Sequence, residues 1–250
     1  IRVGRKGKDQ VTLISGGAEK KYLIYLKGRK RKVLIDVVFP VLHGAQGEDG
    51  AIQGFLRMID IPFVGAGILG SALGMDKYFA KRLFELAKIP VAKFLIFNKY
   101  GASKNPIFEK IKKELGLPVF IKPARLGSSV GANKVNSKKE FQEYLNEAFL
   151  YDDRVLVEEF IDGKEVECSV LGNETPIASL PGEIVVRDGF YSYDAKYSNA
   201  GDVSLNIPAP LPQKTIIEIT RAVETVFIEN QCVGQRAYLK EPMPVAGVPS

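Results

Sequence analysis

Two short β-branched runs lie on either side of a glycine-rich loop and a helical segment near the start of this chain. The first run is KVLIDVVFPV at 32–41, and the loop LHGAQGEDG at 42–50 leads from it into a helix predicted over 50–59. The second run is IPFVGAG at 61–67. Strand, loop, helix and strand in this order form a βαβ unit, which predicts a parallel sheet at the N-terminal end.

Helices and strands alternate in a different way after residue 74. Amphipathic periodicity predicts helices, and short apolar runs bounded by glycine or proline predict strands. The predicted helices cover 75–89 (with Asp76 as cap), 105–116, 138–149 and 213–230, and the predicted strands cover 91–97, 118–124, 154–161, 164–172 and 175–186. We expect a turn at DGKE (162–165) to join the strands 154–161 and 164–172 as neighbours, and 175–186 to continue antiparallel. The fold class is therefore α/β first and α+β later.

Composition excludes several classes of protein. The chain has 250 residues, of which 46% are hydrophobic and 26% charged, as in a globular protein of one to three domains. No apolar run approaches the roughly 20 residues that span a membrane, and the first residues lack the apolar core of a signal peptide. Cys168 and Cys232 are far apart in the sequence, which disfavours a disulfide scaffold or a zinc site and favours a reducing compartment.

The formal net charge of +6 is spread along the chain. Its densest basic run, KGRKRK at 27–32, is interpreted as a solvated loop rather than as a nucleic-acid surface. A mildly basic protein also suits anionic substrates such as nucleotides. We therefore expect a nucleotide rather than a nucleic acid as the charged ligand.

A lysine ends the apolar strand in FIKPARLGSSVGANKV (120–135), and a loop of small residues follows it. Lysine is seldom buried unless it is paired, so Lys122 is expected to point to solvent or to an anion. Gly127 and Gly131 permit backbone angles that form a nest for phosphate oxygens, and Ser128 and Ser129 add hydroxyl donors. Taken alone, the stretch fits a polar turn equally well.

Two carboxylates lie in VLVEEFIDGKEVECSVL (155–171). Glu158 and Glu165 could accept hydrogen bonds from an adenine amine and a ribose hydroxyl, with the backbone of Phe160 and Ile161 beside the adenine. An exposed strand end is the alternative.

Two further loops carry candidate site residues. Lys196 and Tyr197 in YSYDAKYS (191–198) could neutralise an anion and orient a nucleophile. His43, the single histidine, follows a strand at a place where α/β sheets bind ligands, and it could transfer a proton near neutral pH. An ordinary surface loop is the alternative for both.

Five motifs in one order resemble the D-alanine–D-alanine ligases of the ATP-grasp superfamily. They are LHGxxGEDG, MDK, IKPxxxGSSVG, VEEFIDGKEVECSVL and YDAKY, within residues 33–200. The resemblance implies an ATP-grasp fold in which an N-terminal parallel-sheet domain (1–74) precedes two α+β domains (75–157 and 158–250) that clasp ATP.

The resemblance also implies an activity. It is the ATP-dependent ligation of two D-alanines through an acyl phosphate, with Mg²⁺ or Mn²⁺, for cell-wall peptidoglycan precursors, by a cytoplasmic homodimer. A different carboxylate–amine ligase of the ATP-grasp type and a non-catalytic nucleotide-binding relative are the alternatives. D-Alanine dependence of phosphate release discriminates between them.

The family's functional residues carry over to matching positions. The resemblance places Lys77, Lys122, Ser128 and Ser129 at the phosphates of ATP, Glu158, Phe160 and Ile161 at the adenine, Glu165 at the ribose, Lys196 and Tyr197 in a covering loop with Tyr197 directed towards Ser128, His43 near the first D-alanine, Arg236 and Gly247 in the C-terminal catalytic segment, and Glu241 at the metal.

The sequence departs from the family at both ends. Lys8, with Asp9 beside it, stands where the family has a glutamate that holds the first D-alanine. Met243 stands where a metal-ligating asparagine is expected, and the family's metal-binding aspartate has no counterpart between Arg236 and Tyr238. We favour segments missing at these places over a damaged metal site.

Overall fold

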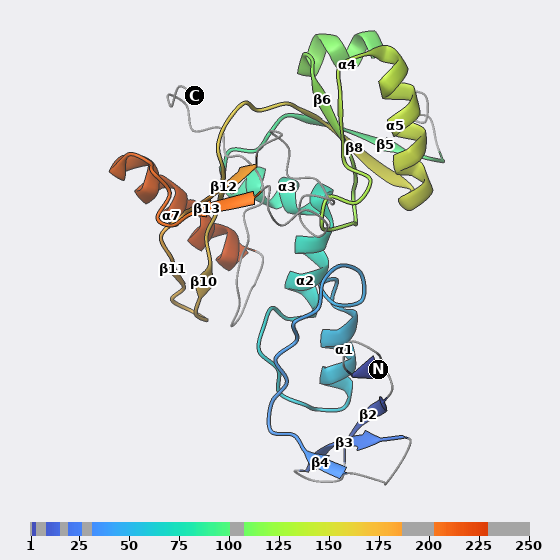
Figure 1. Cartoon of the computed structure of the whole chain (residues 1–250), viewed down its shortest axis with the longest axis vertical. Helices are drawn as coiled ribbons and strands as arrows, with labels where there is room; N and C mark the ends of the chain where they lie inside the picture. Colours follow the sequence, from blue (N-terminus) through green and yellow to red (C-terminus); the bar gives the residue numbers. More distant parts are fainter. Residues whose placement is uncertain are drawn as a thin grey trace.

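The computed structural model describes residues 2–3, 9–15, 20–26, 32–100, 108–186 and 203–229. The elements fall into three groups that follow one another along the chain (Figure 1). The predicted site residues Lys196, Tyr197, Arg236, Glu241 and Gly247 lie outside the described residues, as do Lys8, Met243 and the basic segment 27–31.

The N-terminal group contains an antiparallel sheet with strands in the order β1-β2-β3-β4. Its elements are β1 (Arg2–Val3), β2 (Asp9–Ser15), β3 (Lys21–Tyr25), β4 (Lys32–Leu34) and α1 (Ala51–Met58). Leu13 of β2, Leu56 of α1 and Ile61 after it form a small buried core. The helix predicted over 50–59 is thus confirmed as α1.

The prediction of a parallel N-terminal sheet is wrong. The described strands of this group pair antiparallel, and parallel pairing is limited to one bridge between Val38 and Phe63. Val38 donates to the Pro62 carbonyl at 2.9 Å, and Val64 donates to Val38 at 2.9 Å. Pro40 and Pro62 have no amide hydrogen to donate, so a ladder cannot extend through them. The first run therefore forms the short strand β4 and then extended chain.

Two helices connect the N-terminal group to the central group: α2 (Ile68–Met75) and α3 (Lys77–Leu86). Asp76 caps α3, because its carboxylate accepts hydrogen bonds from the amides of Tyr78 and Phe79 at 3.0 and 3.3 Å. The capping prediction is confirmed. The periodic pattern did not reveal α2, whose sequence ILGSALGM contains two glycines that disfavour a helix.

Replacing Asp76 tests how much the cap contributes. We expect Asp76→Ala to lower the free energy of unfolding by about 1–2 kcal/mol, because two amides lose their acceptor. Asp76→Asn keeps an acceptor at the cap and should lose less than half as much. Urea unfolding followed by circular dichroism measures both, and equal losses in the two variants would show that charge rather than capping matters.

The central group is an antiparallel sheet with the order β5-β8-β6-β7, covered by two helices. Its elements are β5 (Phe94–Asn98), α4 (Phe108–Leu115), β6 (Val119–Pro123), β7 (Asn133–Val135), α5 (Lys138–Tyr151) and β8 (Arg154–Glu159). The helices α4 and α5 lie on one side of this sheet (Figure 1). The core between them includes Ile111, Ile121, Phe141, Leu145 and Val157.

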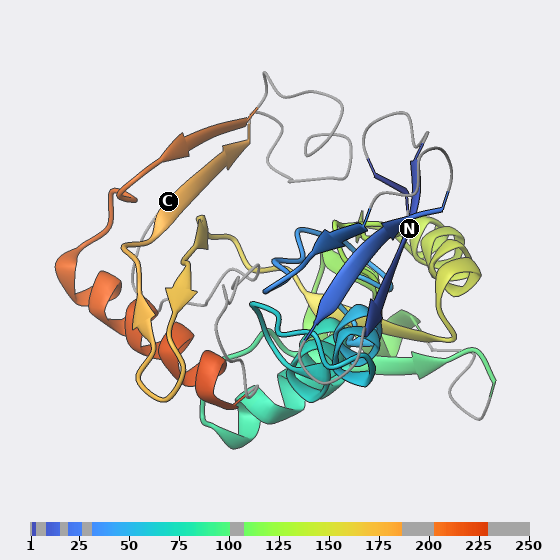
Figure 2. The ribbon, with the colours of Figure 1, turned by 90° about the horizontal axis from the view of Figure 1, so that it is seen from below.

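Among its described residues, the C-terminal group has two small antiparallel sheets, β10-β11 and β13-β12-β9. Its elements are β9 (Glu165–Glu167), β10 (Val170–Leu171), β11 (Ile177–Ala178), β12 (Gly182–Val186), β13 (Val203–Asn206) and α7 (Gln213–Glu229). The group stands apart from the N-terminal strands in both views (Figure 1 and Figure 2). Val223 and Phe227 of α7 pack with Val166, Cys168 and Val170, and burial raises the pKa of the Cys168 thiol to about 11.

The expected pairing of 154–161 with 164–172 is also wrong. β8 lies between β5 and β6 and pairs with both, so neither of its edges is free for a further strand. β9 pairs with β12 instead, in a different sheet. The chain therefore crosses from one sheet to the other at residues 160–164.

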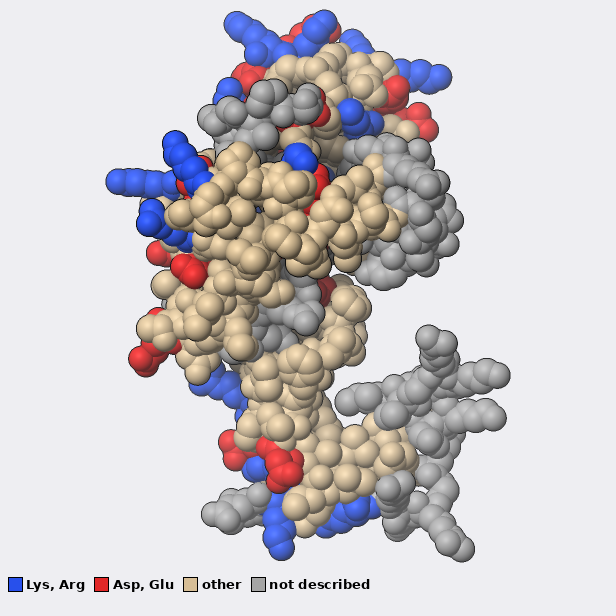
Figure 3. Space-filling model, turned by 60° about the vertical axis from the view of Figure 1, so that its left-hand side comes forward, with Lys and Arg blue, Asp and Glu red and all other residues tan. Residues whose placement is uncertain are grey.

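Within the described residues, no helix is long and apolar enough to cross a membrane. Lysine and arginine side chains are interspersed with acidic ones on the face in Figure 3, instead of gathering in one patch. This distribution agrees with the interpretation that the positive charge is dispersed.

Candidate functional site

The central sheet has two chemically different faces. Alternate residues of β6 and β8 point to opposite sides, and Val119, Ile121, Val155 and Val157 enter the core beneath α4 and α5. The alternate residues of both strands, which include Lys122 and Glu158, point to the opposite face of the sheet. The alternation of residues along β6 and β8 thus places charged groups on the face of the sheet that the helices α4 and α5 leave uncovered.

Glu158 lies at the centre of this second face and is only 2% exposed. It is directly opposite Phe94 of β5 on one side and Phe120 of β6 on the other. Its Oε2 atom lies 2.6 Å from Nζ of Lys122, and its Oε1 atom lies 3.3 Å from Nζ of Lys81 on α3. A buried carboxylate is thus held between two lysines.

The two lysines determine the protonation state of Glu158. Burial by itself would raise the pKa of the carboxyl group, but the positive charges of Lys122 and Lys81 outweigh burial and hold that pKa well below its usual range. Glu158 is therefore ionised at neutral pH. The cluster then has two positive charges and one negative charge.

Aromatic rings lie beside this cluster. The rings of Phe120 and Phe160 have centroids 6.0 Å apart, and Nζ of Lys122 lies 5.5 Å from the Phe120 centroid. Lys134 of β7 lies opposite Phe120, with Nζ 3.8 Å from the Phe160 centroid. Flat apolar surface next to cations can hold a planar ring and an anionic group together.

The glycine-serine loop follows β6 and contains several residues in the left-handed region of backbone conformation. Ser128 and Ser129 both have positive φ values, of 54° and 59°, and Gly131 has a φ of 67°. Non-glycine residues rarely adopt this left-handed region, and consecutive cases are found mainly where a loop serves a function. Successive amides in such a loop can converge on an anion.

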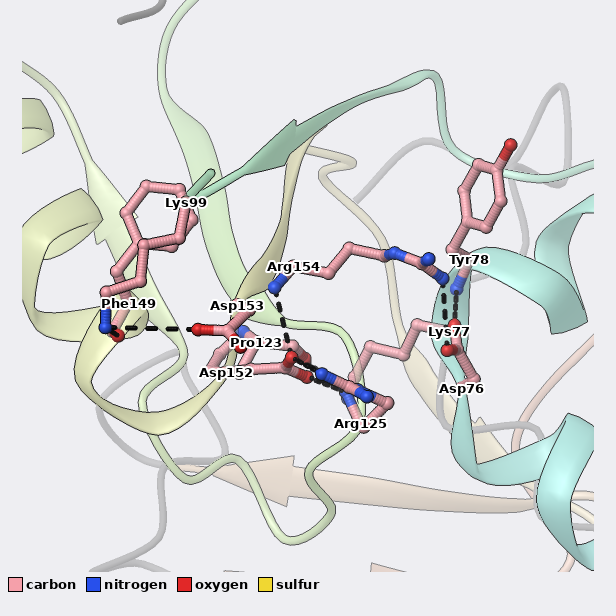
Figure 4. A network of polar contacts seen from close by, with 10 residues as sticks. All are labelled: Asp76, Lys77, Tyr78, Lys99, Pro123, Arg125, Phe149, Asp152, Asp153 and Arg154. Carbon is pink, nitrogen blue, oxygen red and sulfur yellow. Dashed lines mark hydrogen bonds and ion pairs between the residues drawn. The ribbon is translucent and has the colours of Figure 1, made fainter. Parts of the chain in front are cut away.

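Lys77, at the start of α3, contacts the same loop. Its Nζ atom donates to the carbonyl of Pro123 at 3.1 Å (Figure 4). The same atom also donates to the carbonyl of Leu126. The backbone amide of Lys77 also donates to Ala124 at 2.9 Å. Lys77 therefore holds the beginning of the loop, and its predicted contact with a phosphate stays a prediction.

A second network holds the same beginning of the loop, at Arg125. The buried Asp152, which follows α5, accepts hydrogen bonds from the backbone amide and the guanidinium of Arg125 and from the amide of Arg154 (Figure 4). The guanidinium of Arg154 in turn lies 3.4 Å from the Asp76 carboxylate. The network thus links α3, β8 and the loop after β6.

Acid should weaken this network. Burial acts to raise the pKa of Asp152, but the hydrogen bonds from Arg125 and from the two amides outweigh it and hold the pKa below the ordinary 3.8. Stability from this depressed pKa is present above about pH 4 and is lost as the pH falls through the folded-state pKa.

We therefore expect Asp152→Asn to reduce the pH dependence of the unfolding free energy below about pH 4. Asp153→Asn is the matched control, because Asp153 is its exposed neighbour. Urea unfolding at several pH values measures both. An unchanged slope in Asp152→Asn would contradict the prediction.

The N-terminal glycine loop approaches the glycine-serine loop. A Cβ atom placed on Gly127 would lie 3.7 Å from Oε2 of Glu48. Glu48 accepts a hydrogen bond from the Gly44 amide at 2.5 Å, and the exposed His43 is the residue before Gly44. The structure thus brings together two of the loops that the sequence singled out, while a role for His43 stays a prediction.

The other predicted residues divide by position. Phe160, beside the cluster, and Ile161, which follows it, are half-buried in the crossover after β8, and Glu165 is half-buried at the start of β9. In the described part of the chain, no three His, Cys, Asp or Glu side chains form a group that could hold a metal. The predicted metal ligand, Glu241, is not in that part.

Lys81 is the site residue that the sequence analysis did not identify. It is 1% exposed and lies on the buried side of α3, whereas Phe79 and Leu86, which set the apparent apolar stripe, are 46% and 80% exposed. A lysine in a helix that contains other charged residues is expected to lie on the surface. The sequence contained one indication of such a partner: Glu158 lies at the end of an apolar strand, and a buried carboxylate requires cations.

Two family models match most of the chain. The model described as D-ala D-ala ligase C-terminus matches residues 83–236, and the one described as D-ala D-ala ligase N-terminus matches residues 5–66. Between them they include both glycine loops and two members of the cluster, Lys122 and Glu158, whereas Lys81 lies between the two matched ranges.

Curated proteins give the same result. The chain is 47% identical over 219 residues to the D-alanine–D-alanine ligase of Oceanobacillus iheyensis. The aligned region covers 87% of this chain and 59% of that protein. It is 51% identical over 190 residues to the D-alanine–D-alanine ligase of Borrelia duttonii, and the aligned region covers 74% of this chain and 52% of that protein. The chain thus spans less than two thirds of the length of these relatives.

Solved structures are similar in fold. The D-alanine-D-alanine ligase from Coxiella burnetii matches with a TM-score of 0.74 and 32% identity, covering 91% of this chain and 59% of that one. The VanG D-Ala:D-Ser ligase from Enterococcus faecalis matches with a TM-score of 0.76 and 33% identity, and the match covers 96% of this chain and 71% of that one. The mixed α/β fold predicted from the sequence is confirmed at this level.

Proposed function

Because the chain belongs to the D-alanine–D-alanine ligase family, we propose that it joins two D-alanines to D-alanyl-D-alanine with ATP. The observation that carries the proposal is the buried Lys81–Glu158–Lys122 cluster beside the glycine-serine loop. Its net positive charge and the neighbouring aromatic rings are chemistry that fits an adenine nucleotide.

The proposed reaction has two steps. The carboxylate of one D-alanine attacks the γ-phosphorus of ATP, which gives an acyl phosphate and releases ADP. The amine of the second D-alanine then attacks the acyl carbon, loses a proton, and releases phosphate. Phosphoryl transfer depends mainly on positioned cations and donors, because negative charge spreads over the oxygens of the transferred group.

The residues have separate roles in this proposal. Lys122 neutralises charge on the phosphates, the amides of Ser128 and Ser129 donate to them, and Lys77 holds the loop that carries those amides. The adenine lies near Phe120 and Phe160, with Glu158 and the Ile161 backbone as acceptor and donor, and the ribose lies near Glu165.

The remaining assignments are proposals that rest on the family. Lys196 and Tyr197 would cover the site, His43 would lie near the first D-alanine, and Arg236 and Gly247 would complete the catalytic segment. Glu241 would contribute to an Mg²⁺ or Mn²⁺ site, and a bound metal would neutralise phosphate charge. A homodimer in the cytoplasm, where ATP is supplied, and a role in peptidoglycan synthesis complete the proposal.

The division into three domains has support in the packing. One hydrophobic core uses residues between 13 and 63, a second uses residues between 95 and 157, and a third uses residues between 166 and 227. We therefore keep the domains 1–74, 75–157 and 158–250 as proposed, with the last two clasping the nucleotide in an ATP-grasp arrangement.

Phosphate release tests the function. The purified chain with Mg²⁺ and ATP should release phosphate and form the dipeptide when D-alanine is present, and should not do so with L-alanine. ATP binding without D-alanine-dependent turnover would favour the non-catalytic alternative. The likeness to a D-Ala:D-Ser ligase favours a second acceptor as the other candidate, and mass spectrometry of products formed from D-alanine and D-serine together discriminates between the two.

A further inference from the structure

Lys81 is among the most buried large side chains described, although it carries a charge. It is 1% exposed, on the side of α3 that faces the central sheet. Its Nζ atom lies 3.3 Å from Oε1 of Glu158 and 5.5 Å from the centroid of the Phe94 ring. Lysine is rarely buried this completely without a specific partner. A merely structural side chain at this place could be apolar, since Ala80 beside it is buried too.

The two lysines of the cluster differ in their access to a ligand. The side chains of Lys81 and Glu158 are each 2% exposed, whereas the Lys122 side chain is 20% exposed. Lys122 is therefore the cation of the cluster that can reach the phosphates of a molecule outside the sheet. It can leave the carboxylate only if another cation keeps that buried charge compensated.

We propose that Lys81 is a positioning residue, which compensates the buried charge of Glu158 so that the charge of Lys122 is available to the phosphates of a nucleotide. The inference rests on the proposed function, because it takes ATP as the ligand. Without Lys81, Lys122 would become the compensating charge of Glu158, and its interaction with an anion would weaken. Lys81 acts through Glu158 and does not need to touch the nucleotide.

Nucleotide affinity tests the proposal. Isothermal titration calorimetry with Mg²⁺ and ATP, and separately with adenosine, would compare wild type, Lys81→Met, Glu158→Gln and the double variant. Lys139→Met is the matched control, because it removes one positive charge from an exposed position of α5. We expect Lys81→Met to weaken ATP binding about tenfold or more, and adenosine binding by less than about threefold, since adenosine has no phosphate.

The double variant separates positioning from a direct contact. If Lys81 acts through Glu158, then removing the carboxylate charge makes Lys81 dispensable, and the double variant should bind ATP within about threefold of Glu158→Gln. A further tenfold loss in the double variant would overturn the proposal, because Lys81 would then act on the ligand itself. This comparison holds even where Lys81→Met alone does not fold, since the double variant contains no unpaired buried carboxylate.

Each of the remaining outcomes of the calorimetry would overturn the inference. Wild-type affinity for ATP in a folded Lys81→Met would overturn the inference and leave the proposed function standing. Equal losses for ATP and adenosine would overturn it as well, because the effect would not depend on phosphate. A wild-type chain that binds neither ATP nor adenosine would overturn the proposed function, and the inference with it.

Discussion

Lys122→Ala should lower kcat/KM for D-alanine-dependent phosphate release by about two orders of magnitude or more. Loss of one positioned cation from a phosphoryl-transfer site typically costs about 3 kcal/mol of transition-state stabilisation. Lys122 is suited to this role because it lies near the end of β6, is the most exposed member of the cluster around Glu158, and comes a few residues before the loop with the left-handed serines. The prediction assumes the proposed ligase activity.

A matched variant controls for the loss of charge. Lys113→Ala removes an exposed lysine of α4, on the opposite side of the central sheet, and should leave kcat/KM within about twofold. Thermal unfolding of both variants would show that each is folded at the assay temperature. If folded Lys122→Ala kept wild-type kinetics, Lys122 would not be a phosphate ligand.

Glu158→Ala should be the most destabilising single change in the central sheet, with a loss of about 3–5 kcal/mol. The carboxylate lies between Lys81 and Lys122, and removing it leaves two cations close together in a largely buried site. Glu159→Ala is the control on the same strand. Its carboxylate accepts one hydrogen bond, from the Lys93 amide, and its loss should cost about 1 kcal/mol.

A double variant shows whether charge is the reason. Lys81→Met combined with Glu158→Leu replaces the most buried ion pair by apolar side chains, and should be more stable than Glu158→Ala. Guanidinium unfolding monitored by circular dichroism measures the three variants. If Glu158→Ala lost less than 1 kcal/mol, or if the double variant were the less stable, the unpaired lysine would not explain the destabilisation.

Local patterns in the sequence predicted individual elements well. Asp76 was identified as the cap of α3, and the helical periodicity over 138–149 and 213–230 corresponds to α5 and α7. These features depend on residues within one or two turns of each other, so they can be read without knowledge of the fold. The resemblance of ordered motifs to one family is likewise a property of the sequence, and the family models confirm it.

Pairing between strands could not be predicted in the same way. The strand ending at Glu158 has a suitable neighbour in the sequence, but β5 and β6 occupy both of its edges. Pairing depends on which strands compete for an edge, and that competition involves residues distant in the sequence. The short parallel contact at Val38 shows the same limit, because proline placement in both partners decides its length.

By itself the sequence determined the chain's family, the position of the lysine-ended strand with its glycine-serine loop, and most helices. Only the tertiary structure revealed that Lys81 of α3 meets Glu158 of β8 in a buried, net-positive cluster with Lys122. Whether a charged side chain is buried depends on which elements pack against it. A lysine on a helix has the same local sequence whether it faces water or a carboxylate, and only packing distinguishes the two.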